Sequence, residues 1–238
     1  MHSPRGFAAG GHRLTCALSK PDFLCELDAQ GTREFDAIKS VSVYPRDTVV
    51  FTERDEPRGV FILCEGEVKL SISSSEGRVL ILRIARPGDM LGLTATIGGI
   101  PHEVTAETVG ACQVAFVRRE NFLKFLSDHP AVYQYVLKHV ASSYGGICDQ
   151  LRVVSLSSIP QRLAKILLDW SRAADSGENG HSRIALSLTH EEIAECIGTT
   201  RETVTRTLRD FRRRRFITIG DGAVIIHNRK ALQDLAAA

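Results

Sequence analysis

The chain has 238 residues, of which 43% are hydrophobic and 24% are charged, a composition typical of a globular protein and not of a disordered or collagen-like chain. This length fits one or two domains, and we expect two. Because there is no run of about 18 apolar residues and no secretory signal near Met1, we expect a cytoplasmic protein. The six cysteines lie far apart and predict reduced thiols rather than a disulfide framework.

The net charge of +2 is divided unevenly along the chain. Residues 1–154 carry 17 Lys or Arg against 18 Asp or Glu, whereas residues 155–238 carry 13 against 10. Within the second part, residues 201–215 hold seven arginines against Glu202 and Asp210. A basic segment concentrated in this way is typical of proteins that bind the phosphates of nucleic acid.

The N-terminal half has the pattern of an antiparallel β-structure. Residues 1–15 predict a flexible tail. Short apolar or alternating runs, separated by glycines, then lie at 48–51, 60–63, 67–72, 79–84 and 113–117. Strand-length segments at a spacing of roughly 8 to 12 residues predict a β-roll, sandwich or barrel. The polar stretch at 73–77 predicts a hairpin turn.

The periodicity changes to that of a helix after Arg118. Residues 121–126 predict a short helix, and Pro130 marks the start of a longer one. In the longer helix, apolar residues fill the a and d positions of a coiled coil: Tyr133, Leu137, Val140, Tyr144, Ile147, Leu151 and Val154. This seam indicates a parallel dimer interface, the alternative being a helix that lies along its own domain. Gly145 and Gly146 predict a kink or hinge.

A new domain is predicted after this helix. Residues 155–158, followed by Pro160, predict a break and a restart, and we place the domain boundary there. The next segments are an amphipathic helix at 164–170 and a polar loop at 175–181.

The segment 188–228 predicts a winged helix-turn-helix. Thr189 and Glu192 have the spacing of a capping box, as do Thr199 and Glu202. Helices are therefore predicted at 190–197 and 200–214, with Gly198 in the turn between them. The runs at 216–219 and 223–226 add a hairpin, which forms the wing.

The second of these helices predicts base recognition. If Val204 and Leu208 face the core, then Arg201, Glu202 and Arg206 lie on the exposed side of its first turns. Arginine binds guanine O6 and N7, and a carboxylate accepts from cytosine N4, so we expect these three to read bases. The alternative is a capping glutamate with solvated arginines. Residues expected to contact phosphates or to flank the base readers are Thr189, His190, Thr199, Thr200, Thr205, Arg212 and Arg213.

Two motifs resemble the CRP/FNR family of bacterial transcription regulators, and the resemblance runs from about residue 22 to the C-terminus. They are Leu-Thr-x-x-Glu-Ile-Ala-x-x-Ile-Gly-x-Thr-Arg-Glu-Thr-Val-x-Arg-x-Leu at 188–208 and Pro-Gly-Asp-Met-Leu-Gly at 87–92. The resemblance implies a homodimer and an α+β fold, with an N-terminal antiparallel β-roll or jelly roll of the cyclic-nucleotide-binding type. The expected domains are a tail at 1–15, a β-roll sensor at 16–128, a dimerisation helix at 129–154 and a winged helix-turn-helix at 155–238.

The resemblance also implies partners. Arg201, Glu202 and Arg206 align with the base-reading residues of cyclic-AMP-binding members, which implies palindromic half-sites like TGTGA in double-stranded DNA. RNA polymerase is an implied partner, and the loop at 174–182 occupies the place where activators of the family touch it. No membrane partner is expected.

The implied effector pocket departs from the cyclic-AMP pattern. Gly92, Leu93 and Thr94 stand where those members have Gly-Glu-Leu, and Glu103 and Val104 stand where they have an Arg-Ser pair. On the dimerisation helix, Ile147 and Cys148 replace a Thr-Ser pair. Leucine cannot accept a hydrogen bond from ribose, and a carboxylate repels the cyclic phosphate, so cyclic AMP is disfavoured.

Cysteines provide an alternative sensor. The segments 92–97 and 107–112 resemble the FNR side of the family, in which the cysteine matching Cys112 is an iron-sulfur ligand. The candidate set for an iron-sulfur cluster or zinc is Cys16, Cys25, Cys64 and Cys112, although the closely spaced N-terminal cysteines of FNR are absent. The alternative is that most are buried apolar residues, as expected for Cys148 and Cys196. His102 leaves haem as a further candidate.

These observations predict a DNA-binding regulator controlled by a signal in the β-roll other than cyclic AMP. A redox- or metal-responsive regulator is the first alternative. The remote alternative is an enzyme or small-molecule-binding protein whose basic helix is incidental. It is disfavoured because the sequence has no Walker loop, no His-Glu-x-x-His motif and no Ser/His/Asp constellation in a motif context.

Overall fold

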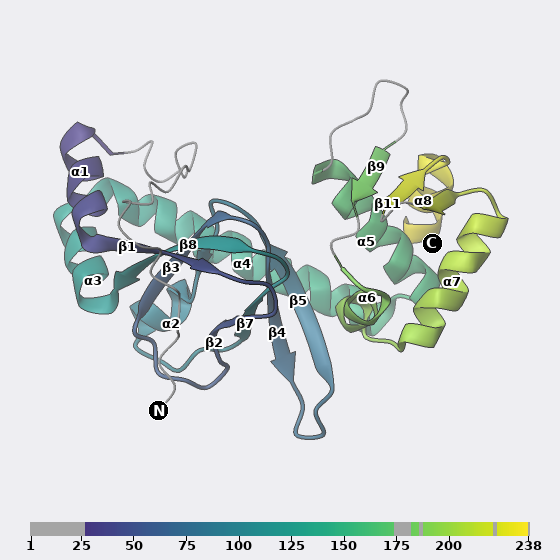
Figure 1. The fold of residues 1–238 in the computed structure, drawn as a ribbon, viewed down its shortest axis with the longest axis horizontal. Coiled ribbons are helices and arrows are strands. Elements are labelled where there is room, and N and C mark those ends of the chain that lie inside the picture. Colours follow the sequence, from purple (N-terminus) through teal and green to yellow (C-terminus); the bar gives the residue numbers. More distant parts are fainter. Residues whose placement is uncertain (1–26, 174–181, 186–187, 221–222, 238) are drawn as a thin grey trace. The chain divides into compact units, whose positions relative to one another are not determined.

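The computed structural model describes residues 27–173, 182–185, 188–220 and 223–237. The chain forms two compact units (Figure 1). The first comprises Met1–Arg78 and Leu82–Ile147, and the second comprises Val79–Ile81 and Cys148–Ala238. No helix in the described part of the chain is long and apolar enough to cross a membrane.

Two four-stranded sheets form the β-roll of the N-terminal half. One sheet has the strand order β1 (Lys39–Tyr44), β8 (Cys112–Arg118), β3 (Gly59–Glu65) and β6 (Met90–Leu91). The other has the order β2 (Val49–Phe51), β7 (Thr105–Thr108), β4 (Val68–Ser73) and β5 (Val79–Ala85). Strand pairs β1–β8 and β3–β8 are antiparallel, which agrees with the predicted antiparallel β-roll.

The central strand β3 is buried on both faces. Successive side chains of a strand point to opposite faces, so Val60 and Ile62 enter one core cluster while Phe61 and Leu63 enter another. The first cluster also contains side chains of helices, and the second lies among strands of both sheets. Each face of this sheet therefore has its own hydrophobic core.

The hairpin turn predicted at residues 73–77 is confirmed. The amide of Ser74 donates to the carbonyl of Arg78 at 2.9 Å, and the amide of Gly77 donates to the carbonyl of Ser74 at 3.0 Å. Gly77 has φ of 80°, a conformation that glycine adopts without steric cost. This turn joins β4 to β5, which are neighbours in their sheet.

Short helices accompany the first sheet (Figure 1). They are α1 (Ala29–Ile38), α2 (Leu93–Gly98) and α3 (Arg119–Asp128). Phe35 of α1 and Phe125 of α3 pack with ring centroids 5.2 Å apart, and His129 contacts the Glu34 carboxylate at 2.8 Å. These contacts join α1 to the end of α3 over the helical core cluster.

The long helix α4 (Pro130–Leu156) begins at Pro130, as predicted, and continues through Gly145 and Gly146. It has two apolar faces. Val132 and Val136 are buried in the core cluster with α1 and α3. Five of the seven seam residues instead face outward, with exposed fractions of 50% for Tyr133, 70% for Leu137, 70% for Tyr144, 49% for Ile147 and 65% for Leu151. The other two are half-buried, and Val140 packs against that cluster.

In the described part of the C-terminal half, six helices and strands precede the last helix. They are α5 (Ile159–Ala173), β9 (Ser182–Ala185), α6 (His190–Ile197), α7 (Arg201–Arg213) and the hairpin of β10 (Ile217–Gly220) with β11 (Ala223–Ile226). The helix α8 (Arg229–Ala237) follows. The predicted break before Pro160 is confirmed, because α4 ends at Leu156 and α5 begins at Ile159. The antiparallel sheet β10-β11-β9 contains the predicted hairpin and adds β9, which the sequence did not predict.

Candidate nucleic-acid interface

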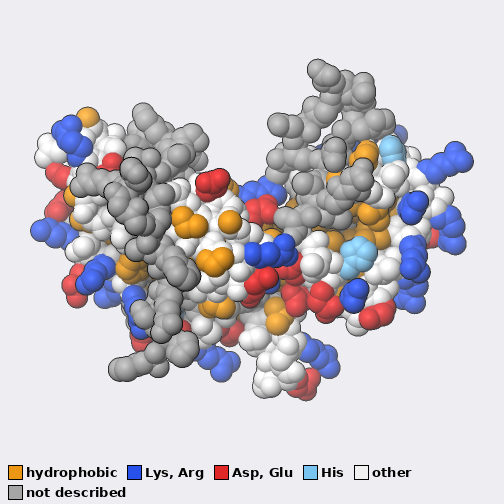
Figure 2. All heavy atoms as spheres, viewed as in Figure 1, with side chains coloured by type: hydrophobic (Ala, Val, Ile, Leu, Met, Phe, Trp, Pro, Cys, Tyr) orange, Lys and Arg blue, Asp and Glu red, His pale blue; other side chains and the backbone are white. Residues whose placement is uncertain are grey.

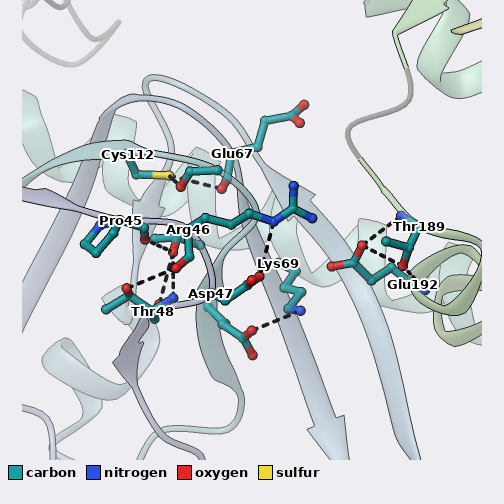
Figure 3. Close-up of polar contacts among 12 residues, drawn as sticks. Pro45, Arg46, Asp47, Thr48, Glu67, Lys69, Cys112, Thr189 and Glu192 are labelled. Carbon is teal, nitrogen blue, oxygen red and sulfur yellow. Dashed lines mark hydrogen bonds and ion pairs between the residues drawn. The ribbon is translucent and has the colours of Figure 1, made fainter. Parts of the chain in front are cut away.

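The first helix of the helix-turn-helix begins with the predicted capping box. Thr189 Oγ1 accepts from the amide of Glu192 at 3.2 Å, and the Glu192 carboxylate accepts from the amide of Thr189 at 2.8 Å (Figure 3). Two amides that an α-helix leaves unpaired at its start are thus satisfied. Ile193, Ala194 and Ile197 are buried, so the cap fixes which face of α6 enters the core.

The turn between the helices differs from the prediction in one respect. Gly198 adopts a left-handed conformation with φ of 62° and ends α6, and the amide of Thr199 also donates to the carbonyl of Ala194 at 3.0 Å. Thr199 therefore completes the end of α6. The predicted capping box of Thr199 with Glu202 is wrong, because Thr200 is the N-cap of α7 and accepts from the amide of Thr203.

The arrangement of α7 agrees with its predicted faces. Its buried residues are Val204, Thr207, Leu208 and Phe211. Arg201, Glu202 and Arg206 are exposed near its start. Bonds to its own backbone amide and to the Thr200 side chain lower the pKa of Glu202, so its carboxylate is charged at neutral pH. The geometry required for base reading is present, while base reading itself stays a prediction.

A contact between α6 and α7 ties the start of the helix-turn-helix together. His190 Nδ1 lies 3.0 Å from Thr205 Oγ1, and the Thr205 hydroxyl donates to the carbonyl of Arg201 at 3.0 Å. Thr189, Thr199 and Thr200, the other threonines expected near phosphates, lie at the caps of the same two helices. The threonines and the histidine therefore lie at or near the ends of α6 and the start of α7, the helix that carries the base-reading candidates.

Arginines continue beyond the first turns of α7. Figure 2 shows Lys and Arg side chains gathered along this helix. Asp210 forms ion pairs with Arg213 at 2.6 Å and with Arg214 at 2.8 Å, while Arg212 is exposed. Arg209 is exposed one turn after Arg206, and sequence reasoning missed it although its spacing of three residues gives the signal.

Hydrogen bonds also stabilise the wing and the C-terminal end of α6. Thr218 Oγ1 and His227 Nε2 are 2.7 Å apart beside the hairpin, whose tip at 221–222 lies outside the described residues. Arg162 of α5 donates to the carbonyl of Ile197, the last residue of α6, and Gln150 Nε2 donates to the carbonyl of Cys196 at 2.7 Å. These bonds satisfy carbonyls at the end of α6 that the helix leaves unpaired.

The candidate effector residues of the β-roll differ in exposure. Gly92 is the N-cap of α2 with φ of 68°, Leu93 is buried, and Thr94 is exposed. Glu103 is exposed, and Val104 packs against the core cluster between the sheets. Ile147 and Cys148 lie on α4, where Ile147 is exposed.

His102 packs within this segment. Its side chain is 3% exposed and stacks on Phe51 with ring centroids 4.0 Å apart. A Cβ added at Gly92 would lie 2.8 Å from the His102 ring, so glycine is needed for this packing. Burial lowers the pKa of His102, which keeps the ring neutral. This environment fits a structural role for His102 in packing better than a role as a haem ligand, which would have to be accessible to the haem.

The cysteines do not form the candidate metal set in the described part of the chain. Cys64 and Cys112 belong to different core clusters, because strands β3 and β8 turn them to opposite faces of one sheet. Cys64 is disulfide-bonded, so the expectation of reduced thiols is wrong for this residue. Cys16 and Cys25 lie outside the described residues. Among those described, no group of three or more His, Cys, Asp or Glu side chains could hold a metal ion.

Cys112 is a buried thiol rather than an exposed ligand. Its sulfur lies 3.2 Å from the carbonyl oxygen of Glu67 (Figure 3) and 3.4 Å from that of Gly110. Burial raises the pKa of Cys112, which disfavours the thiolate that metals and oxidants require. Cys196 is buried as expected, whereas Cys148 is only half-buried.

A β-roll, a long helix with an exposed apolar seam and a winged helix-turn-helix with an arginine-rich second helix define a class of DNA-binding regulators. Residues 41–129 match the cyclic nucleotide-binding domain family, and residues 161–235 match the Crp-like helix-turn-helix domain family. The chain belongs to the CRP/FNR family of transcription regulators. The prediction of a regulator rather than an enzyme is thereby confirmed.

Similar proteins share this class. A CRP-like cAMP-activated global transcriptional regulator of Mycobacterium tuberculosis is 29% identical over 79% of this chain and 84% of its own length. The nitrogen fixation regulation protein FixK of Bradyrhizobium diazoefficiens is 26% identical over 94% of this chain and 93% of its own. The structure of FixK2 from Bradyrhizobium japonicum, 24% identical, has a similar fold, with a TM-score of 0.76 over 84% of this chain and 98% of that one.

Proposed function

We propose that the protein is a homodimer that binds palindromic DNA and reads half-sites like TGTGA with α7. The observation that carries the proposal is the exposed set of Arg201, Glu202 and Arg206 at the start of a helix whose opposite face is buried. The two arginines suit guanine, and the Glu202 carboxylate suits the amino group of cytosine. A set of this kind discriminates bases as well as attracting phosphate.

Phosphate contacts would position the helix in the major groove. The residues proposed to make these contacts or to flank the base readers are Thr189, His190, Thr199, Thr200, Thr205, Arg212 and Arg213. Threonine hydroxyls and amides at the start of a helix hydrogen-bond to phosphate oxygens, and the positive end of the helix dipole favours the same anions. These contacts carry affinity, whereas the three base-reading residues carry specificity.

The seam of α4 supports the dimer. Tyr133, Leu137, Tyr144, Ile147 and Leu151 are at least 49% exposed in the single chain. A narrow apolar stripe of this spacing buries its surface against a copy of itself. In this proposal residues 16–128 are the sensor, 129–154 the dimerisation helix and 155–238 the DNA-binding domain, and the two-fold axis matches a palindrome.

We propose that the controlling signal acts in the β-roll and is not cyclic AMP. The segment from Gly92 to Val104 contains no Lys or Arg that could bind a cyclic phosphate. Leu93 is buried and Glu103 is a carboxylate, and the nearby Arg119 guanidinium is bonded to the carbonyl of Thr96 at 2.8 Å. The signal would shift the population of DNA-binding arrangements across a hinge near residues 154–159, where α4 ends and α5 begins.

Binding measurements on full-length protein test the DNA-reading proposal. Fluorescence anisotropy at one stated salt concentration would compare a TGTGA palindrome, a TTGAT palindrome and a scrambled duplex. We expect a preference for TGTGA, which Arg201→Ala and Arg206→Ala should each reduce by about 1–3 kcal/mol. The matched control Arg213→Ala should weaken binding to all three duplexes alike. Unchanged discrimination in the first two variants would contradict the assignment.

The remaining partners follow from the proposed function. A regulator that binds promoters acts in the cytoplasm and meets RNA polymerase there. The loop at 174–181, where we expect polymerase contact, lies outside the described residues. A pull-down of polymerase on promoter DNA, with and without substitutions in this loop, would test that partner.

A further inference from the structure

The bond between His190 and Thr205 constrains the protonation of the imidazole. Thr205 Oγ1 lies 3.0 Å from His190 Nδ1 and 3.0 Å from the carbonyl oxygen of Arg201. A hydroxyl has one proton to donate, and the carbonyl oxygen can only accept. Both bonds exist together only if Thr205 donates to Arg201 and accepts from an Nδ1–H of His190.

This arrangement fixes what the other ring nitrogen can do. In the neutral ring with Nδ1–H, Nε2 carries a lone pair and only accepts hydrogen bonds. A phosphate oxygen is also an acceptor, so a neutral His190 held in this way cannot bond to it. The imidazolium donates from both nitrogens and can bond Thr205 and a phosphate at once.

The surroundings of the ring suit a phosphate. His190 is the first residue of α6, where the helix dipole favours an anion. Charged residues near the pair along the two helices include Glu191 and Glu192 on α6. On α7, Arg201 and Arg209 lie one turn before and after Thr205, and Arg206 follows it directly. Glu192 is engaged in the capping box with Thr189. The arginines of α7 are exposed, so the anion would lie among positive charges.

We propose that His190 is a proton-linked phosphate contact and that Thr205 is its positioning residue. The inference deepens the proposed DNA-binding function and rests on it. When a phosphate binds, Nε2 takes up a proton from solvent, and the resulting Nε2–H donates a hydrogen bond to the phosphate oxygen. DNA affinity therefore falls as pH rises through the range in which histidine titrates.

The first test is the pH dependence of binding by the full-length protein. Affinity for a scrambled duplex at low salt, measured from pH 6 to 8, reports phosphate contact without any demand for base reading. We expect a decrease of about three- to tenfold per DNA-binding domain, since each proton taken up contributes at most tenfold per pH unit. His190→Gln keeps a donor that does not titrate and should flatten the profile. A slope as steep in His190→Gln as in the parent would overturn the proposal.

Two controls separate this role from a structural one. His227→Gln changes another exposed histidine of the same domain and should keep the slope. Thr205→Val removes the hydroxyl and should reduce the slope, while Thr205→Ser restores it. Because a merely structural role of Thr205 would change affinity equally at all pH values, the slope distinguishes the two.

The second test needs no DNA. Imidazole nitrogen NMR at pH 8 should show the Nδ1–H tautomer of His190 in the free protein, and Thr205→Val should abolish this preference. An Nε2–H tautomer in the parent protein would overturn the proposal even if DNA is bound as proposed. Conversely, a protein that shows the Nδ1–H tautomer but binds no duplex would contradict the proposed function instead.

Discussion

The guanidinium of Arg162 holds the carbonyl of Ile197, with Nη1 donating to that oxygen at 2.9 Å. Nε of the same side chain donates to the carbonyl of Ser157 at 2.8 Å. Arg162 of α5 thus joins the last residue of α6 to the segment that precedes α5. A positive charge at a helix C-terminus also interacts favourably with the helix dipole.

Replacing Arg162 should destabilise the DNA-binding domain. Arg162→Met keeps much of the aliphatic length but removes both charge-assisted bonds, and we expect a loss of about 1–3 kcal/mol in the free energy of unfolding. Urea unfolding followed by circular dichroism measures it. Arg162→Lys keeps the charge but reaches fewer carbonyls, so its loss should be intermediate. Equal stability of all three proteins would show that these bonds contribute nothing.

The exposed seam predicts which substitutions dissociate the dimer. Leu137 and Leu151 are 70% and 65% exposed in the single chain, and burial of each leucine in a dimer would contribute about 1.5–3 kcal/mol per chain. Leu137→Glu and Leu151→Glu should therefore raise the dissociation constant by at least about 100-fold. Sedimentation equilibrium measures this change. Lys138→Glu, a charge change next to Leu137 but outside the seam, is the matched control, and a dimer that survives Leu137→Glu would exclude the seam.

Two histidines, the buried His102 and the half-buried His139, predict that the β-roll loses stability in acid. Burial lowers the pKa of His102 and also that of His139 on α4, and each ring has a nitrogen without a hydrogen-bond partner. The unfolded chain takes up protons as pH falls through about 6.5, before the folded chain does. Stability should therefore fall between about pH 7 and pH 5, by at most about 1.4 kcal/mol per pH unit for each histidine.

Thermal unfolding from pH 7.5 to 5.5 checks this dependence. His139→Gln removes one titrating group and should make the decline of the unfolding temperature less steep, whatever its effect at pH 7.5. His190→Gln, which changes a histidine outside the β-roll, should leave the decline unchanged. An identical slope in His139→Gln and the parent would contradict the assignment to His139.

Sequence patterns predict those helices and strands whose structure is determined by residues close to them in the chain. The helix at 190–197 matches α6, because its cap and its glycine lie within a few residues of it. The strands at 60–63 and 113–117 lie inside β3 and β8, since strands buried in a core are apolar along their length. The a and d seam predicts the long helix, but it does not reveal the second, buried face that contains Val132 and Val136.

The elements that were missed depend on contacts distant in sequence. Helix α1 buries only Phe35 and Gly31, and α8 buries only Leu232. So few buried residues give no recurring apolar spacing from which a helix could be predicted. Strands β6 and β9 have two and four residues and exist because a neighbouring strand pairs with them. In the candidate site, the pattern assigns Thr199 to the wrong helix, because Thr199 is the single residue between Gly198, the C-cap of α6, and Thr200, the N-cap of α7. To predict that the Cys64 and Cys112 side chains point to opposite faces of the sheet, one must know the register in which β3 pairs with β8.

The short distance between Thr200 and Val204 limits how DNA specificity can change in evolution. Thr200 is the N-cap of α7 and Val204 is the first buried residue of that helix, with Arg201 and Glu202 between them. Each residue of an α-helix advances the chain by about 100° around the axis. One residue inserted or deleted in this interval would therefore turn the candidate base readers away from the surface they now share with Arg206. Descendants of this sequence can acquire new target sites by substitution on a fixed frame, whereas a change of length there removes the reading surface.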